Sequence, residues 1–271
     1  MIENKKCTVF NGVPTMFLAM MNSSKREKFD LSTLKGGLMA GSSILPTEYM
    51  RLCEVFGFTN LQTAFGQTES SPAITTSMKN DSIEKKAYTS GKVLDNVEIR
   101  IYLDGKKVND GDEGEIQTRG YHVMQGYYNM PEETKATVSE DGWLATGDLG
   151  CLDEDGYLHV TGRIKDIIVR GGENISPMEV ENVISQIDGI KNVKVVGVKA
   201  AVIQEEVVAC IVWKDNEKHS QKEVIEFVKN QIADYKVPKY VFDFDELPLN
   251  SSGKVLSNVL SEICYKKINE D

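Results

Sequence analysis

Residues 64–69 gather side chains that could bind a phosphorylated nucleotide. Phe65 offers an aromatic face, Thr68 a hydroxyl and Glu69 a carboxylate, beside the small residue Gly66. An aromatic ring can stack on a base, a hydroxyl can contact a phosphate, and a carboxylate is an oxygen ligand of the kind that Mg²⁺ prefers. An ordinary polar turn after a strand explains the same residues, and for this segment alone it is the better explanation.

Two further segments carry charged groups where the chain is expected to turn. Residues 143–148 end in Asp148, whose carboxylate could accept hydrogen bonds from the two hydroxyls of a ribose. An aspartate that only caps a turn is an equally good explanation. Residues 162–166 place Arg163 and Lys165 just before an apolar strand, where a solvated linker would also explain them.

Lys254 follows Ser251, Ser252 and Gly253 on a predicted loop before the last helix. The glycine beside it leaves the ammonium group free to reach outward toward an anionic ligand. Most lysines are exposed without a specific function, and that is the better explanation for Lys254 in isolation. Only the joint pattern of these segments can therefore favour a function.

The composition excludes several other classes of function. The 31 Lys and Arg against 41 Asp and Glu give a net charge of −10, which argues against a nucleic-acid binder because such a protein needs a clustered basic face. No apolar run is long enough to span a bilayer, so no transmembrane segment is expected. The patterns G-x-x-x-x-G-K-[ST] and G-x-G-x-x-G are both missing, which leaves the common nucleotide-binding folds unsupported.

The histidines and cysteines indicate neither a metal site nor a disulfide framework. The three histidines lack metal-ligand spacing, and the five cysteines are odd in number, widely spaced and never in a C-x-x-C pair. Cysteines used in this way are typical of a reducing compartment, so a cytoplasmic location is predicted.

The elements that must position the candidate residues fall into two predicted domains. Residues 1–165 combine an α/β region over 1–87 with a β-rich region over 88–165, for which a small barrel or a curled sheet is expected. Residues 166–271 form a small α+β domain of a size that folds alone. The predicted fold class is therefore α/β plus α+β.

Proline and glycine fix several element boundaries. Helices are predicted to begin at Pro14 and at Pro46, and the second to end at Gly57, because proline suits the first turn of a helix and glycine its end. A short helix is predicted over 131–138. Alternating apolar residues from Val97 onward predict a strand of a hairpin.

Two capping boxes are predicted in the small domain. Ser176 and Glu179 have the spacing of the first, and Ser220 and Glu223 have the spacing of the second. In such a box the serine binds a backbone N–H of the first turn, and the glutamate binds back to the serine N–H.

Taken together, the segments resemble the adenylate-forming superfamily, which comprises acyl-CoA synthetases, luciferases and the adenylation domains of peptide synthetases. The matching segments occur in the family's order and cover nearly the whole chain: 12–15, 36–46, 65–69, 114–116, 126–129, 131–132, 141–150, 162–181, 235–238 and 248–254. Any one of them would be a weak signal, whereas all of them in order are very specific. Residues 170–177 are most similar to the corresponding motif of fatty or aryl acid CoA ligases.

The resemblance implies a role for each candidate residue. Thr68 would contact the nucleotide phosphate, and Glu69 would coordinate Mg²⁺. Asp148 and Arg163 would bind the ribose hydroxyls, and Lys254 would be the catalytic lysine of adenylation.

The resemblance also implies a hinge and the lining of the nucleotide site. Lys165 falls at the family's hinge position between the two domains. The other nucleotide-binding positions would be Gly37, Phe65, Gly66 and Gln67. Two departures from the family stand out: Phe65 replaces a frequent tyrosine, and the tail after Lys254 lacks the usual basic residues.

The implied reaction uses ATP, Mg²⁺, CoA and a small carboxylic acid, and it would place the protein in fatty acid metabolism. The acid attacks the α-phosphate of ATP to give acyl-AMP and pyrophosphate, and the CoA thiol then displaces AMP. Between the two steps the small domain would rotate about Lys165.

One family feature is missing from the 271 residues. The Ser/Thr/Gly-rich phosphate loop has no counterpart, so the chain resembles a carboxy-terminal half. We expect the isolated chain to be inactive, and to form a homodimer or a complex with a polypeptide that carries the amino-terminal half, because a divided sheet exposes an edge. Alternatives are a non-catalytic nucleotide-binding or assembly subunit, a freestanding adenylation enzyme with another acceptor, and a piece cut from a longer enzyme.

Overall fold

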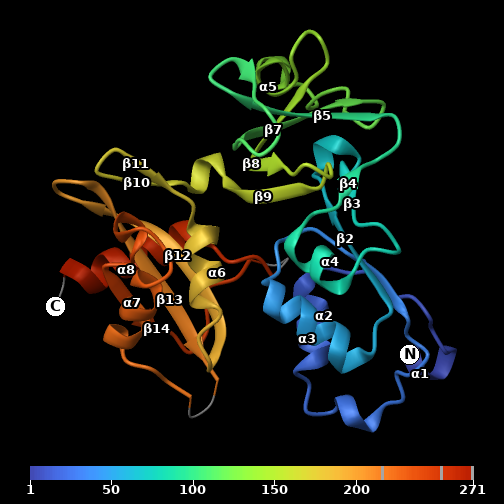
Figure 1. The fold of residues 1–271 in the computed structure, drawn as a ribbon, viewed down its shortest axis with the longest axis horizontal. Helices are drawn as coiled ribbons and strands as arrows, with labels where there is room; N and C mark the ends of the chain where they lie inside the picture. Colours follow the sequence, from blue (N-terminus) through green and yellow to red (C-terminus); the bar gives the residue numbers. More distant parts are fainter. Residues whose placement is uncertain (215–216, 251–252, 270–271) are drawn as a thin grey trace. The chain divides into compact units, whose positions relative to one another are not determined.

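The computed structural model describes residues 1–214, 217–250 and 253–269. The chain divides into two compact units, Met1–Val160 and Thr161–Asp271, which we call the N-terminal unit and the C-terminal unit. Strand β9 (Leu158–Arg163) crosses this division, and the short 3₁₀ helix η3 (Ile164–Asp166), which contains Lys165, follows it (Figure 1).

The N-terminal unit alternates helices with strands and then becomes rich in strands. Its helices are α1 (Ile2–Lys5), α2 (Pro14–Met21), α3 (Pro46–Phe56), α4 (Ile83–Tyr88) and α5 (Pro131–Thr137). Its strands before β9 are β1 (Gly36–Met39), β2 (Asn60–Phe65), β3 (Thr75–Thr76), β4 (Lys92–Val93), β5 (Val97–Leu103), β6 (Lys106–Lys107), β7 (Gly114–Gly120) and β8 (Leu144–Leu152). The prolines begin α2 and α3, and Gly57 ends α3 with φ of 62°, as the sequence predicts.

The first sheet of the N-terminal unit has the strand order β1-β2-β3-β4, and β1 runs parallel to β2. Residues 8–12 lie along the outer side of β1, where Val9 bridges Gly36 and Gly12 bridges Met39 in parallel. Its core is apolar and combines helices and sheet through the fully buried residues Phe17, Leu34, Tyr49, Leu52 and Leu61. The α/β character predicted for this region is confirmed.

The second sheet has the order β6-β5-β7-β8-β9 and is open. The expectation of a barrel is wrong for the described strands, because no strand pairing joins β6 to β9. Strand β6 is only two residues long and both are exposed, so it offers too few backbone groups to close the sheet. The hairpin predicted from Val97 onward agrees with the antiparallel pairing of β5 with β6 and β7.

The C-terminal unit is an α+β domain. Its helices are α6 (Pro177–Ile184), α7 (Gln221–Lys229) and α8 (Ser257–Asn269), and its strands after β9 are β10 (Ile168–Arg170), β11 (Glu173–Ile175), β12 (Ile190–Ala200), β13 (Gln204–Trp213) and β14 (Tyr240–Asp243). The sheet order is β11-β10-β13-β12, with β14 parallel to β13. Strand β13 is buried on both faces, and its even-numbered residues from Val208 to Val212 share a cluster with Leu260 and Cys264 of α8.

The two predicted capping boxes have different outcomes. At α7 the box forms: the Ser220 hydroxyl accepts from the Glu223 N–H, and the Glu223 carboxylate accepts from the Ser220 N–H at 2.8 Å. At α6 the box does not form, because the Ser176 hydroxyl donates to the carbonyl of Thr161. The Glu179 carboxylate binds the Lys236 ammonium at 2.7 Å instead of accepting from the Ser176 N–H.

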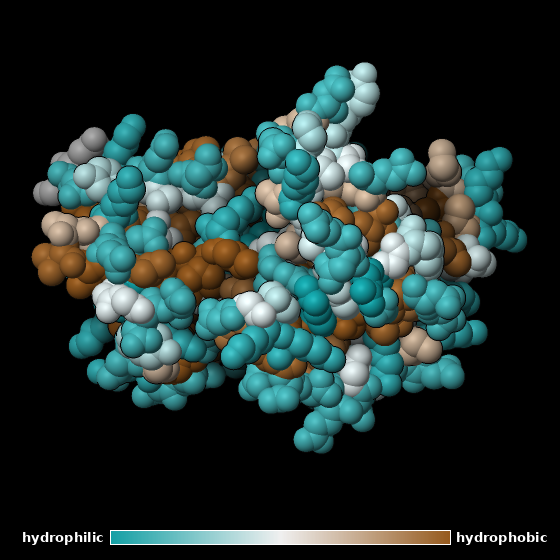
Figure 2. All heavy atoms as spheres, turned by 90° about the horizontal axis from the view of Figure 1, so that it is seen from above, coloured by the Kyte–Doolittle hydropathy of each residue, from teal (hydrophilic) through white to brown (hydrophobic). Residues whose placement is uncertain are grey.

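The surface mixes hydrophilic and apolar atoms, and Figure 2 shows apolar patches between hydrophilic residues on the face that it presents. Scattered apolar atoms are normal on protein surfaces, so only apolar residues beside an open sheet edge need an explanation. No helix in the described part of the chain is long and apolar enough to cross a membrane.

Candidate functional site

Residues 65–70, which we call the Glu69 turn, connect the end of β2 to the short 3₁₀ helix η2 (Thr68–Ser70). The chain folds back closely here, and a Cβ at Gly66 would lie 2.0 Å from the carbonyl oxygen of Pro72, so only glycine fits. Ser70 is fully buried, and its hydroxyl accepts from the Gln67 N–H at 3.0 Å and donates to the Gln67 carbonyl at 2.9 Å. Buried hydrogen bonds therefore fix the backbone of the turn.

The side chains of the Glu69 turn differ in exposure. Thr68 is exposed, whereas Phe65, Gln67 and Glu69 are half-buried. The Phe65 ring packs against a cluster formed by Ile101, Ile116 and Leu158. The ring thus contributes to the core of the N-terminal unit, and its predicted stacking on a base stays a prediction.

Glu69 is held by Tyr127, a residue to which sequence reasoning gave no role. The Tyr127 hydroxyl donates to Glu69 Oε1 at 2.8 Å, and the Met124 N–H donates to the Glu69 carbonyl at 2.8 Å. The Tyr127 N–H donates to Thr134 Oγ1 on α5 at 2.9 Å. The bond to the carboxylate raises the pKa of Tyr127, because the phenol proton is shared with an anionic acceptor. The sequence signal was the 126–129 motif, whose contact with Glu69 only the structure reveals.

Asp148 lies in β8, and only 5% of the residue is exposed. Side chains hold the backbone around it: Gly147 N–H donates to Glu115 Oε1 at 3.2 Å, and Asp148 N–H donates to Thr146 Oγ1 at 3.1 Å. Thr146 Oγ1 in turn donates to the carbonyl of Ile116 at 2.6 Å. The pairing of β7 with β8 is irregular at this level, which gives Asp148 a backbone setting unlike that of a regular ladder.

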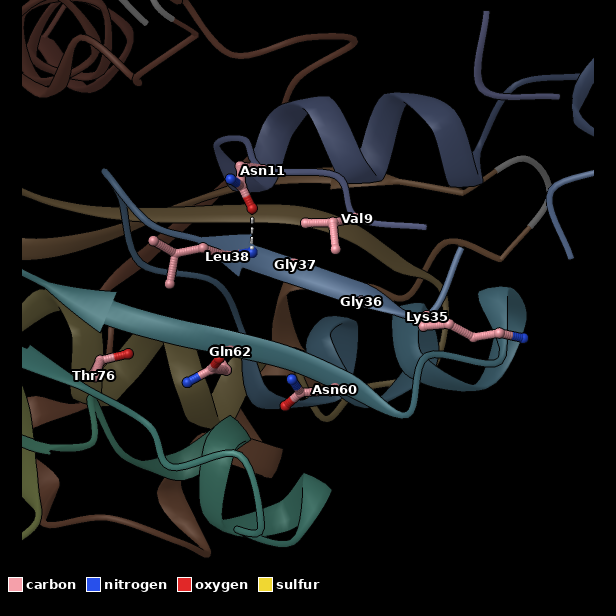
Figure 3. Close-up of a pocket in the computed structure, with 9 residues that line it drawn as sticks. All are labelled: Val9, Asn11, Lys35, Gly36, Gly37, Leu38, Asn60, Gln62 and Thr76. Carbon is pink, nitrogen blue, oxygen red and sulfur yellow. Dashed lines mark hydrogen bonds between the residues drawn. The ribbon is translucent and has the colours of Figure 1, made fainter. Parts of the chain in front are cut away.

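Gly37 lies in β1, where residues 8–12 approach so closely that a Cβ at position 37 would be 1.8 Å from the carbonyl oxygen of Phe10. It lines a pocket of about 380 Å³ along β1 and β2 (Figure 3). The lining residues are Val9, Asn11, Lys35, Gly36, Gly37, Leu38, Asn60, Gln62 and Thr76. Neither the Glu69 turn nor Asp148 lines this pocket. The pocket therefore does not bring Gly37 together with the other candidate residues, and the nucleotide role of Gly37 stays a prediction.

Arg163 and Lys165 belong to the C-terminal unit. Arg163 ends β9 and is exposed, and Lys165 is exposed in η3. The hydroxyl of Ser176 at the start of α6 donates to the carbonyl of Thr161, so the segment just before Arg163 is fastened to the body of this unit. This bond spans Lys165, because Thr161 precedes it and Ser176 follows it, and the hinge role of Lys165 stays a prediction.

The described residues 249, 250 and 253–255 surround Lys254, and we call them the Lys254 turn. Asn250 N–H donates to the Lys254 carbonyl at 2.8 Å, Lys254 N–H donates to Asn250 Oδ1 at 2.9 Å, and Leu249 bridges Val255. The Lys254 side chain is exposed, and its ammonium has no partner among the described residues. Ser251 and Ser252, which the sequence places beside it, lie outside the described residues.

The described residues contain no group of three or more His, Cys, Asp or Glu that could hold a metal ion by itself. Mg²⁺ is commonly held by one or two carboxylates together with the phosphates of a substrate and several waters. A single positioned carboxylate such as Glu69 therefore fits a metal ion that binds together with a nucleotide.

Two models of a known enzyme family match the chain. The model of the AMP-binding enzyme family matches residues 1–128, and the model of the AMP-binding enzyme C-terminal domain matches residues 179–254. The chain belongs to the AMP-binding, adenylate-forming enzyme family, which confirms the resemblance seen in its motifs.

Individual relatives and solved structures agree. The chain is 43% identical to YngI of Bacillus subtilis, a provisionally named acyl-CoA synthetase, over 99% of this chain and 49% of YngI. It is 37% identical to the mitochondrial medium-chain acyl-CoA ligase ACSF2 of Danio rerio, over 98% of this chain and 44% of that protein. The ATP-bound structure of MatB from Rhodopseudomonas palustris matches with a TM-score of 0.88 and 31% identity, over 97% of this chain and 52% of MatB. The chain thus spans about half the length of the relatives it matches.

Proposed function

We propose that the chain is the carboxy-terminal half of an AMP-forming acid–CoA ligase, which activates a carboxylic acid with ATP and transfers the acyl group to the thiol of CoA. The observation that carries this proposal is the match of both family models, in order, within one chain. The names of YngI and ACSF2 support acyl-CoA chemistry, and the ATP bound to MatB supports the nucleotide. A place in fatty acid metabolism and a cytoplasmic location are further parts of the proposal.

The N-terminal unit would supply most of the nucleotide-binding groups. Thr68 would contact a phosphate, and Glu69 would hold Mg²⁺, which supplies positive charge beside the phosphate oxygens. Tyr127 would keep the Glu69 carboxylate in one orientation, because its hydroxyl donates to Glu69 Oε1. Asp148 would accept hydrogen bonds from the ribose hydroxyls, and Arg163 of the C-terminal unit would donate to the ribose oxygens.

The C-terminal unit would supply the mobile cation. During the attack of the carboxylate on the α-phosphate, negative charge develops on phosphoryl oxygens, and the ammonium of Lys254 would stabilise it electrostatically. A rotation about Lys165 would then withdraw Lys254 and admit the thiol. The exposure of Lys254 on a short turn supports such an intermittent role.

Activity would need the amino-terminal half of the ligase in addition to these 271 residues. Phe10 N–H and Gly12 N–H donate inward to β1, to the carbonyls of Gly36 and Leu38, both at 3.0 Å. The backbone groups of Val9 and Asn11 therefore point outward, and no strand covers them within residues 1–160, all of which the structure describes.

We propose that the amino-terminal half of a ligase occupies this edge, since about half of each relative has no counterpart here. Apolar side chains beside the edge support the proposal, because Val9 is 60% exposed and Leu38 is 38% exposed. Both residues line the pocket of Figure 3. A homodimer through the same edge is the competing outcome.

The test is pyrophosphate release from ATP with a panel of fatty and aryl acids, measured on this chain alone and after co-expression with a matching amino-terminal half. We expect acid-dependent release only from the pair. Val9→Lys, which places a charge on the edge, should abolish co-purification. Val202→Lys, at a position that is 91% exposed in the C-terminal unit, is the matched control and should leave the pair intact.

Other outcomes would contradict the proposal in defined ways. Robust release by the isolated chain would show that no partner is needed. A pair that binds AMP without releasing pyrophosphate would indicate a non-catalytic nucleotide-binding or assembly subunit. Acyl-AMP formation without a CoA thioester would indicate a freestanding adenylation enzyme that uses another acceptor.

A further inference from the structure

Two cysteines of the C-terminal unit meet in its core. Cys210 in β13 and Cys264 in α8 are 54 positions apart in the chain, and their Sγ atoms are 3.3 Å apart. Both residues are fully buried, in an apolar cluster that includes Val196, Val208 and Leu260. The other cysteines, Cys7, Cys53 and Cys151, belong to the N-terminal unit.

The distance between the two sulfur atoms leaves little movement before a bond can form. A disulfide bond is about 2.05 Å long, so the sulfurs need to approach by a little over 1 Å from their separation of 3.3 Å. The two thiols also differ in acidity. The hydrogen bond between the two thiols, together with burial, raises the pKa of Cys210, whereas the same hydrogen bond and the nearby Lys267 lower the pKa of Cys264.

We propose that Cys210 and Cys264 are a reversible modification site, which oxidation converts to a disulfide that joins α8 to β13. The oxidant would be a peroxide. The sulfur of Cys264 attacks a peroxide oxygen, the O–O bond breaks, and a sulfenic acid and water result. The sulfur of Cys210 then attacks the sulfenic sulfur, the S–O bond breaks, and the thiol proton leaves with the hydroxyl as a second water.

Access to the pair depends on α8. Among the described residues of α8, only Leu260 and Cys264 are fully buried, so a small apolar face holds this helix against the sheet. A local opening of α8 would expose both sulfurs without unfolding the rest of the unit. The disulfide should therefore form in the folded chain, more slowly than oxidation of an exposed thiol.

The disulfide would also restrict the Lys254 turn. Val255 at the end of this turn packs against the same cluster as the two cysteines, and α8 begins two residues later at Ser257. A disulfide would fasten α8, and with it one side of the turn. By closing a loop between residues 54 positions apart, it should raise the melting temperature of the C-terminal unit by about 10 °C.

Peptide mapping of the full chain tests the proposal. The folded chain is treated with hydrogen peroxide, free thiols are alkylated, and trypsin cuts after the flanking lysines to give peptides 200–214 and 255–266. We expect these two peptides joined, lighter than their sum by two hydrogen atoms, and separated again by dithiothreitol. Cys264→Ala should abolish the joined peptide, and Cys53→Ala, a buried thiol of the other unit, should not.

A second sample of the unmutated chain, oxidised in concentrated urea, serves as the reference. Because this comparison uses no variant, it does not depend on whether a variant folds. The proposal predicts that the 210–264 pairing dominates in the folded chain and is diluted by other pairings in urea. Equal pairing in both samples would overturn it, as would a joined peptide that leaves the melting temperature unchanged or lowers it.

Discussion

The Glu69 turn and the Lys254 turn are both short and polar, but their side chains have different surroundings. In the Glu69 turn the carboxylate accepts a hydrogen bond from Tyr127, and the neighbouring Ser70 is fully buried. In the Lys254 turn the described hydrogen bonds join the Lys254 backbone to Asn250, and the lysine side chain is exposed.

The different surroundings of the two side chains suit two different functions. A group that holds a metal ion or a nucleotide in one place is most effective when packing and hydrogen bonds fix it in advance. A group that acts in one step and must be absent from the next is better presented from a solvent-facing turn on a separate unit. The following predictions test whether the two turns differ in this way.

The largest effect is expected for Lys254→Ala. In the complex with the amino-terminal half, acyl-AMP formation should slow by about 10²–10³-fold, because a positioned charge donor is lost from the transition state. Thioester formation from supplied acyl-AMP should suffer much less. Lys266→Ala, at an exposed position of α8, is the control and should leave both half-reactions unchanged. Equal losses in both half-reactions would refute an intermittent role.

The second largest effect is expected for Asp148→Ala. In the same complex it should weaken AMP binding by about 1–3 kcal/mol, because the ribose hydroxyls lose a charged acceptor. Calorimetric titration with AMP measures the change, and a melting curve checks that replacement of a buried carboxylate has left the chain folded. Asp148→Asn, which keeps the shape and one acceptor oxygen, should lose less. Unchanged AMP affinity in both variants would remove Asp148 from the site.

Ser70→Ala tests whether buried hydrogen bonds fix the Glu69 turn. The variant leaves the Gln67 N–H without its acceptor and should lower the free energy of unfolding by about 1–2 kcal/mol. Ser71→Ala is the neighbouring control at an exposed position and should change it by less than about 0.5 kcal/mol. Urea denaturation compares the two, and equal effects would show that the turn is not held by Ser70.

The smallest effect is expected for Tyr127→Phe. Loss of the hydrogen bond to Glu69 should weaken binding of Mg²⁺-ATP to the complex by about 0.5–1.5 kcal/mol, with little change in AMP binding without Mg²⁺. Tyr128→Phe, in which the adjacent ring is 90% exposed, is the matched control. If the two variants bind Mg²⁺-ATP equally well, Tyr127 does not orient a metal ligand.

Local signals in the sequence predicted local structure well. The helices at Pro14, Pro46 and Pro131 begin where proline permits, and the hairpin after β5 turns at Asp104 and Gly105, both with positive φ. Each of these features depends on neighbours in the chain, so its physical cause is visible in a few consecutive letters.

Features that depend on distant residues could not be predicted in this way. Ser176 and Ser220 have the same capping pattern, but the hydroxyl of Ser176 donates to the carbonyl of Thr161 instead of capping its helix. The bond between Tyr127 and Glu69 joins residues 58 positions apart. The cysteine spacing likewise gave no sign that two thiols would meet. A family resemblance supplies such roles only for residues whose roles in the family are known.

The open edge at residues 8–12 has a consequence for how much of this chain a cell can maintain. A partner that binds the folded chain shifts its folding equilibrium in proportion to the partner's concentration. Unbound copies, with Val9 exposed at 60%, would spend more time in states that proteases and chaperones recognise. We therefore expect the chain to last longer in the cell when the amino-terminal half of a ligase covers this edge than when the edge stays open.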